Sequence, residues 1–400
     1  LSDEDYVEVG FVGETKDREG RKTELTVTNN SITDLDIISG PIDGIINFGD
    51  GSDLSYDLTS QPKDQYNATL ERNALYLKGL LKPMDGLDIT FGARKVDLTQ
   101  SVEQYTIVDN VVGTVTNTLE IDKLLPSVGA KYDLNENNQF RLAYSETFVY
   151  PDFREFVNAE FMHPVFWPKI AGNPDLVETD IQSVDFRYSY YFDKTDSIST
   201  SLFYKHMDNP IEDTQEFTTS TLPRYSFENS KAADLAGIEL SWYTHLDFIS
   251  DYLDDLSFSG NYTYIDSQVD LTDEQKHKYV TQDSGLQGLS PQVINLAITY
   301  DQSESRSVNL SYNKMSERMM RVALTHGDVI YGLDDYEVPP HLLDFTWIEQ
   351  CRSDALDTDF AMTFKIKNIL DSETVWKQGD NVTFRYKTGQ SYSLSLNARF

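Results

Sequence analysis

The last ten residues, Ser391-Tyr392-Ser393-Leu394-Ser395-Leu396-Asn397-Ala398-Arg399-Phe400, decide the fold. Every second side chain is apolar, whereas the side chains between them are serine, asparagine or arginine. Such strict period-two alternation indicates a β-strand whose two faces meet different solvents. About ten residues also match the length that a tilted strand needs to cross a lipid bilayer. The segment therefore predicts a membrane-crossing strand.

The same alternation recurs upstream. Between residues 184 and 192, for example, Val184, Phe186 and Tyr188 alternate with Asp185 and Arg187. Comparable segments lie at 87–94, 256–264, 294–300, 307–312 and 360–367. Aromatic residues gather near the ends of these segments, which is typical of a ring of aromatic side chains at the membrane interfaces, although ordinary cross-strand packing explains them as well. The repeated pattern predicts a wall of strands with one greasy face.

The connections distinguish a membrane barrel from a soluble sandwich. Short turns rich in Asp, Asn, Gly or Ser are expected at 82–86, 133–138, 193–196 and 301–305. Long links, each of roughly 20 residues, alternate with them at 100–122, 149–178, 209–225, 268–289, 317–339 and 369–389. Long links on one rim and tight turns on the other are typical of outer-membrane barrels. We therefore predict an all-β fold, a transmembrane antiparallel β-barrel with long extracellular loops and short periplasmic turns.

The alternation predicts about fifteen strands, including a weaker pair at 6–15 and 21–29 and a final strand that ends on the short-turn side. Closed single-chain bacterial barrels have even strand numbers, so an odd count suggests that strands are missing at the N-terminus. The chain also opens on acidic residues without an initiator Met or a signal-peptide pattern. We expect residues 1–400 to be one domain, the C-terminal part of a longer barrel.

Composition excludes several classes of protein. The net charge of -33, from 33 basic and 66 acidic residues, argues against a nucleic-acid partner. Acidic loops exposed to solvent would account for this charge, and so would acidic loops that bind divalent cations among lipopolysaccharide head groups. No apolar run of about 18 residues predicts a transmembrane helix. The single Cys351 cannot form an intrachain disulfide, and no Cys/His cluster has metal-ligand spacing, so we expect no metal site and no cofactor.

Several motifs, in order, resemble the barrel of TonB-dependent receptors. Residues 125–132, 140–147 and 150–156 read LPSVGAKY, FRLAYSET and YPDFREF, where the family has a strand ending in a YSxT-like motif and then an RPxFREL-like loop. Residues 172–179, GNPDLVET, are similar to the family's GNPxLKPE segment. Weaker matches lie at 236–240, 286–291 and 367–371, so the resemblance covers roughly residues 66–400. Tyr150 and Val177 depart from the usual Arg and Lys, which weakens any ligand assignment taken from relatives.

The resemblance implies a receptor in the bacterial outer membrane that imports a scarce small-molecule ligand. Its barrel would have about 22 strands and enclose a plug, and energy would arrive through TonB. The plug and the TonB box do not occur in these residues. A ferric siderophore or similar iron chelate is favoured by the family's usual ligands, while an oligosaccharide, another organic nutrient or a passive channel stays open. Further implied partners are outer-membrane lipid, lipopolysaccharide and the barrel insertion machinery, for which the terminal Phe400 would be the assembly signal.

The loop at 149–178 is the richest candidate for ligand binding because its aromatic side chains can stack on a solute. The same cluster would equally pack the loop on itself or over the plug. The candidate ligand contacts are Phe153, Arg154, Phe161, His163, Phe166 and Trp167. Inward polar positions would contact the plug or line a water-filled lumen, and the candidates are Arg141, Asp185, Arg187, Glu239 and Arg399.

Two other classes remain as alternatives. No Ser/His/Asp grouping occurs in a context typical of hydrolases, so we expect no enzyme. A soluble β-sandwich or lectin would also alternate, but it would bury its apolar faces against a second sheet and would purify without detergent.

Overall fold

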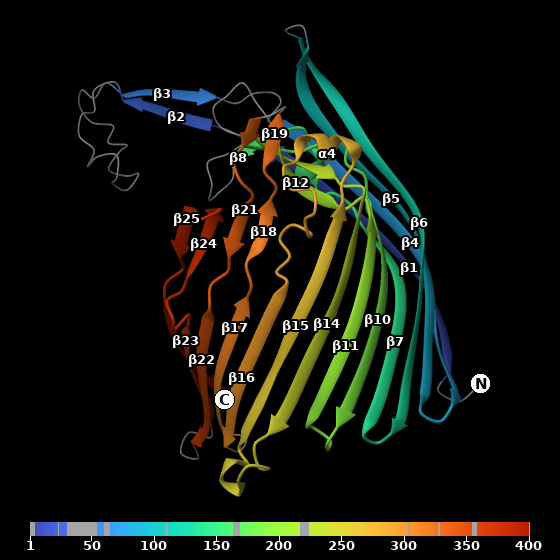
Figure 1. The fold of residues 1–400 in the computed structure, drawn as a ribbon, viewed down its shortest axis with the longest axis vertical. Helices are drawn as coiled ribbons and strands as arrows, with labels where there is room; N and C mark the ends of the chain where they lie inside the picture. The colour runs from blue at the N-terminus through green and yellow to red at the C-terminus, as the bar shows by residue number, and fades with distance from the viewer. Residues whose placement is uncertain are drawn as a thin grey trace.

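The computed structural model describes residues 5–22, 24–29, 54–59, 65–108, 111–162, 169–216, 224–302, 305–326, 329–353 and 358–399. Most of them form one curved antiparallel sheet of 14 strands (Figure 1). Each strand pairs with the sheet strands that come before and after it in the sequence. The strands, in spatial order, are β1 (Tyr6–Arg21), β4 (Gln65–Met84), β5 (Leu87–Val108), β6 (Val111–Asn135), β7 (Asn138–Val149), β10 (Thr179–Tyr191), β11 (Ser197–Asp208), β14 (Ala232–His245), β15 (Leu256–Asp270), β16 (Gln292–Gln302), β17 (Arg306–Met315), β22 (Leu342–Ser353), β23 (Thr358–Lys367) and β26 (Ser391–Arg399).

The smaller elements lie in the connections. The long ones contain β2 (Glu24–Asn29), β3 (Leu54–Thr59), α3 (Phe153–Phe156), β8 (Glu160–Met162), β9 (Lys169–Ala171), β12 (Ile211–Glu216), β13 (Arg224–Asn229), α4 (Asp273–Lys278), β18 (Arg318–Arg321), β19 (Leu324–His326), β20 (Val329–Tyr331), β21 (Asp335–Val338), β24 (Glu373–Gln378) and β25 (Asn381–Lys387). The 3-10 helix η2 (Asp251–Leu253) lies in the link between β14 and β15. Among the described helices, none combines the length and the apolar character needed to span a membrane.

The convex face of the sheet is apolar. Strand register places Leu142, Phe186, Leu202 and Ile238 in one row across β7, β10, β11 and β14. All four side chains are at least 38% exposed, although they are large and apolar. On β26 the same face presents Leu394 and Leu396. Exposing such a continuous apolar band to water would be costly. Its position on the outside of the sheet fits contact with lipid rather than the buried core of a sandwich.

Short and long links alternate along most of the sheet, as the sequence predicted, and the close connection between β5 and β6 is an exception. The wall begins with β1 and ends with β26 at the short-turn end (Figure 1). The tight β4–β5 turn depends on Gly86, whose φ of +79° lies in the left-handed region. A Cβ there would also lie 2.6 Å from the carbonyl oxygen of Asp133 on the neighbouring hairpin. Glycine is therefore required at this turn for two independent reasons.

One expected long link is a pair of strands instead. The prediction of a link at 100–122 is wrong, because β5 and β6 stay paired as far as Val108 and Val111. The inward side chains Val102 and Ile121 are buried beneath the connection between β7 and β10, which we call the inner loop. The apolar inward face of the hairpin therefore continues into the region where a link was expected. The many Val and Thr residues of this segment also favour extended backbone.

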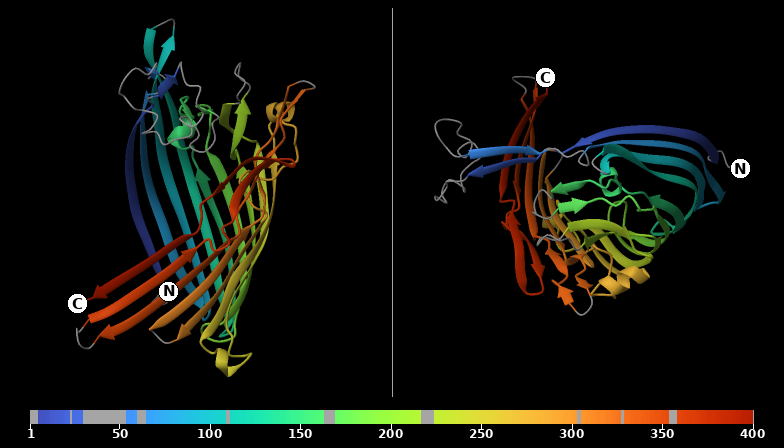
Figure 2. Two further views of the ribbon diagram at one scale, coloured as in Figure 1. Left: turned by 90° about the vertical axis from the view of Figure 1, so that its left-hand side faces the viewer. Right: turned by 90° about the horizontal axis from the view of Figure 1, so that it is seen from above.

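The N-terminal pair also differs from the prediction. Residues 6–15 and 21–29 do not form a hairpin, because β1 is continuous and pairs along its whole length with β4, while β2 pairs with β3 outside the large sheet. Among the described residues, the large sheet has 14 strands, where the sequence predicted about fifteen. Its two edges are β1 and β26, and Figure 2 shows the wall from above as an open arc.

Candidate functional site

The connection between β7 and β10 folds inward over the concave face of the wall (Figure 2). It starts with the single turn α3, which a capping box stabilises. The carboxylate of Asp152 accepts a hydrogen bond from the backbone amide of Arg154 at 2.9 Å, and the carboxylate of Glu155 accepts one from the amide of Asp152 at 2.8 Å. This local arrangement determines which side chains of α3 face the wall.

Apolar packing holds α3 against the wall. Phe153 and Phe156 are only 4% and 2% exposed. They share one buried cluster with side chains that alternate along the concave face of β4, β5 and β6, among them Leu70, Val96, Leu98, Val102 and Ile121. Burying an aromatic side chain of this size is worth roughly 2–3 kcal/mol. The inner loop is thus a packed part of the molecule.

Two glutamines of β5 bind the backbone of the same loop. The side-chain amide of Gln100, itself 1% exposed, donates to the carbonyl of Pro151 at 3.0 Å. Four residues farther along the same face of β5, Gln104 donates to the carbonyl of Asn158 at 2.6 Å. These bonds satisfy buried carbonyls that no ladder reaches. They also explain why polar residues interrupt an otherwise apolar face.

The structure places only part of the predicted ligand-binding set. Phe153 faces the wall, whereas Arg154, its neighbour on α3, is exposed on the other side. Phe161 lies in β8, and its side chain is outside the described residues. His163, Phe166 and Trp167 also lie outside them. Of the six candidates, the described structure therefore brings together Phe153 and Arg154, on opposite faces of α3.

Four of the five predicted inward residues share the concave face. Register aligns Arg141, Arg187 and Glu239 in one row that continues from Lys131. Asp185 lies on the same face of β10 as Arg187, two residues away. The fifth candidate, Arg399, pairs through its backbone with Asp359, and its side chain is outside the described residues.

The two arginines of that row are bonded only to neutral groups. Arg187 donates to the hydroxyl of Ser199 at 2.6 Å, and Arg141 donates to the side-chain oxygen of Gln139 at 2.8 Å. Within the described part of the chain, no carboxylate lies within salt-bridge distance of either guanidinium. The concave face therefore presents two guanidinium groups near the short-turn end that no described carboxylate contacts directly.

The later strands of the β7–β10 connection join the other long connections in a second assembly at the same end, which we call the loop layer. It comprises the sheet β12-β13-β9-β8, the sheet β18-β21-β24-β25 and the segment containing α4. The first of these sheets joins two separate connections, because β13 pairs in parallel with β9. Strands from distant parts of the sequence are thus tied together over the wall.

Arg321 links several parts of the loop layer. Its guanidinium is 3.9 Å from the ring centroid of Tyr225 and 5.8 Å from that of Trp376. It also pairs with a carboxylate oxygen of Asp335 at 3.3 Å and, more loosely, with one of Asp213 at 3.8 Å. Because the side chain is only 8% exposed, these stacking and ionic contacts operate with little screening by water.

Buried polar groups form the other half of the loop layer. Glu212 accepts hydrogen bonds from the amide of Gln287 at 3.2 Å and the hydroxyl of Ser230 at 3.1 Å. Burial nevertheless raises the pKa of Glu212 to about 7 against these two bonds, and nearby carboxylates add to the increase. Burial and the adjacent Glu228, which accepts a hydrogen bond from the Tyr279 hydroxyl, raise the pKa of Tyr279.

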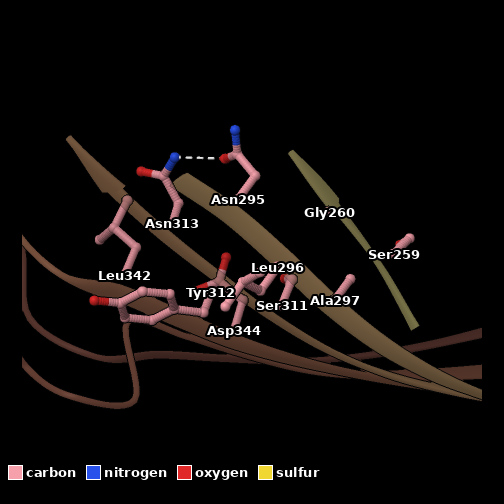
Figure 3. A pocket seen from close by; sticks show the side chains of 10 residues that line it. All are labelled: Ser259, Gly260, Asn295, Leu296, Ala297, Ser311, Tyr312, Asn313, Leu342 and Asp344. Carbon is pink, nitrogen blue, oxygen red and sulfur yellow. Dashed lines mark hydrogen bonds between the residues drawn. The ribbon is translucent and has the colours of Figure 1, made fainter. Parts of the chain in front are cut away.

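Two pockets border this region. One, of about 350 Å³, lies between β15, the β15–β16 link and the start of the β17–β22 connection. It is lined by several carboxylates and by Arg318. The other, of about 290 Å³, is a recess of the concave wall. Figure 3 shows two of its asparagines, Asn313 and Asn295, of which Asn313 donates to Asn295 at 2.6 Å. Asn295 donates in turn to Asn261 at 2.8 Å. Neither pocket was predicted. Across the described residues, no group of three or more His, Cys, Asp or Glu could hold a metal ion.

Sequence reasoning missed the residues that organise the loops. Gln100 and Gln104 could have been found, because the alternation of apolar side chains continues through Val96, Leu98 and Val102 past the predicted strand end. Glu212 and Arg321 had no such signal, since their partners come from other connections. Only the folded arrangement shows that these two side chains are buried.

An apolar convex face, a charged concave face and long connections at one end define the wall of a transmembrane β-barrel. A family model described as "TonB dependent receptor-like, beta-barrel" matches residues 9–399. The chain therefore belongs to the TonB-dependent receptor β-barrel family, whose members are outer-membrane proteins. A search of curated protein sequences found no match.

Solved structures of the same fold include siderophore receptors. The siderophore receptor PiuA from Acinetobacter baumannii has a TM-score of 0.62 at 12% identity, over 99% of this chain and 53% of that one. The ferric-catecholate import receptor Fiu from K12 E. coli has a TM-score of 0.58 at 15% identity, over 97% and 52%. The ferric yersiniabactin uptake receptor FyuA from Yersinia pestis has a TM-score of 0.52 at 14% identity, over 86% and 46%. The chain thus spans about half the length of these receptors, and identities this low establish the fold alone.

Proposed function

We propose that this chain is barrel wall from an outer-membrane receptor that imports a scarce solute, with energy delivered through TonB to a plug. The observation that carries the proposal is the family match across the wall, combined with a charged concave face beneath inward-folded loops. The favoured solute is a ferric siderophore or similar iron chelate, because several solved structures with the same fold are receptors for such ligands.

In this proposal the long-loop end faces outward and captures the ligand. Arg154 is exposed on the inner loop and would contact the solute, together with Phe161, His163, Phe166 and Trp167 farther along the same connection. Phe153 would hold the inner loop in place rather than contact the solute, because its ring is buried against the wall. An arginine suits the anionic groups of an iron chelate, since guanidinium binds carboxylates and catecholates through charge-assisted hydrogen bonds.

The concave face would be the seat of the plug. Arg141 and Arg187 lie side by side in register and lack carboxylate partners among the described residues, so carboxylates of the plug would neutralise them. Asp185, Glu239 and Arg399 would add further polar contacts. A wall already neutralised by its own residues would not need such a partner.

Assembly in the membrane involves the opposite face. The apolar row of the convex face would contact outer-membrane lipid, and acidic loops would bind divalent cations among the lipopolysaccharide head groups. Phe400 would be read by the barrel insertion machinery as the end of the last strand. Because the apolar side chains of β26 are already aligned, a terminal aromatic would extend the same face.

Transport measurements test the proposal. Cells producing the full-length receptor should take up a labelled ferric siderophore only when TonB is present, and uptake should stop when the proton-motive force is collapsed. Uptake of an oligosaccharide instead, again dependent on TonB, would change the substrate but keep the class. Equal uptake with and without TonB would show a passive channel and overturn the proposal.

A further inference from the structure

The link between β14 and β15, residues 246–255, differs from the other connections at the short-turn end. It is the one that contains a helical turn, η2, among the described short links. It also exposes three large apolar side chains: Phe248 is 72% exposed, Ile249 62% and Tyr252 96%. Single exposed apolar residues are common on proteins, but three within five positions form a patch.

The backbone of this link is held in place. The amide of Leu246 donates to the carbonyl of Leu256 at 2.8 Å and so closes the link at its base. The amide of Leu253 donates to the carbonyl of Ser250 at 2.8 Å, and the Ser250 hydroxyl caps the turn by accepting from the amide of Tyr252 at 3.3 Å. The exposed side chains are therefore presented by an ordered turn, which lowers the entropy cost of binding.

Position and charge argue against lipid as the occupant. Figure 1 shows the link extending past the other turns at its end of the wall. It carries four aspartates and no Lys or Arg between residues 246 and 256. None of these carboxylates has a basic partner within salt-bridge distance in the described part of the chain; they are Asp247, Asp251, Asp254 and Asp255. Anionic lipid would be repelled by such a patch, whereas a protein surface with basic and apolar groups would complement it.

We propose that residues 246–255 are a docking surface for the periplasmic domain of TonB, through a basic surface of that domain next to an apolar one. The inference rests on the proposed function, which places TonB at the short-turn end. The three apolar side chains would supply the contact area, while the aspartates would orient the partner and speed its approach. The barrel wall would then share in recognising the partner that acts on the plug.

Binding of purified TonB periplasmic domain to the full-length receptor in nanodiscs tests this directly. Replacing the patch with Phe248→Ser, Ile249→Ser and Tyr252→Ser should raise Kd by about tenfold or more. The double change Asp251→Lys and Asp254→Lys should raise Kd by a similar factor, roughly tenfold. The unaltered receptor should bind more strongly at low salt than at about 0.5 M NaCl, because salt screens the attraction of the aspartates for a basic partner.

Matched controls come from other turns at the same end. Met84 and Leu134 are 55% and 53% exposed, and Met84→Ser with Leu134→Ser should leave Kd unchanged. Kd values for both patch variants within about twofold of the unaltered receptor would overturn the docking surface while leaving the proposed function intact. Absence of TonB binding to every receptor, including the unaltered one, would overturn the proposed function itself. Loss of binding to anionic phospholipid vesicles, with TonB binding unchanged, would show a lipid contact and also overturn the proposal.

Discussion

Two regions at the long-loop end are held together by different physics. The inner loop around α3 is fixed to the wall by buried aromatic rings and two amide hydrogen bonds. The loop layer is held by Arg321, by buried carboxylates and by stacking between separate connections. Apolar packing depends little on pH or salt, whereas buried ionisable groups depend on their protonation. The inner loop should thus behave as permanent structure, and the loop layer as the part that conditions can loosen.

The largest effect should come from removing an aromatic ring of the inner loop. Phe156→Ala in the full-length receptor leaves a cavity against the wall and should destabilise the docked loop by about 4 kcal/mol. Hydrogen–deuterium exchange of residues 150–160 measures this as faster exchange of the loop amides. Phe192→Ala is the matched control, because Phe192 is 62% exposed. Unchanged exchange in the Phe156 variant would mean that the ring does not fix the loop.

Removing the guanidinium of Arg321 should come next. Arg321→Met leaves the buried Asp335 with only Gln378 as a hydrogen-bond donor and should destabilise the loop layer by about 3 kcal/mol. Limited proteolysis of the β17–β22 connection in the intact receptor reports the opening. Adding Asp335→Asn should restore part of the resistance, since no charge then stays buried alone. If the single variant resisted protease like the unaltered receptor, the comparison between the two regions would fail.

A pH titration separates the regions further. The folded-state pKa of Glu212 is raised to about 7, above its usual 4.5, so between these values the folded form holds a proton that the unfolded form has lost. Loop-layer stability should therefore fall as pH rises from about 4.5 to 7, by up to about 3 kcal/mol. Protection from amide exchange across β12 and the segment after α4, measured relative to the intrinsic exchange rate at each pH, should fall over this window. Glu212→Gln should remove that dependence, whereas the weaker pH dependence of residues 150–160, where burial raises the pKa of Glu155, should be the same in both proteins.

The smallest effect concerns the amide contacts of the inner loop. Gln100→Leu removes the donor to the Pro151 carbonyl and should cost about 1 kcal/mol. The readout is again exchange at residues 150–160, compared with Gln182→Leu, a change at an exposed glutamine of β10. A loss as large as that of Phe156→Ala would show that hydrogen bonding, rather than apolar packing, dominates the inner loop.

The wall could be predicted because its information is local. Alternation along residues such as 184–192 and 391–400 states which face meets lipid, and the turn residues state where strands end. The errors arose where the pattern was weak or continued unexpectedly, at β1 and at the extended β5–β6 hairpin. Arg141, Asp185, Arg187 and Glu239 share one face in the register because the same parity places them opposite the apolar row.

The sequence by itself therefore determined the sheet, its two faces and most of the alternation of short and long links. A side-chain period of two can be recognised within one segment, without knowing which segment pairs with it. Tertiary structure alone decided that Phe153 packs against the wall, that Arg321 stacks on Tyr225, and that Glu212 is buried. These groups lie in different connections that meet only after the wall has formed. Their burial, and the raised pKa of Glu212 that follows from it, arise only where these connections meet.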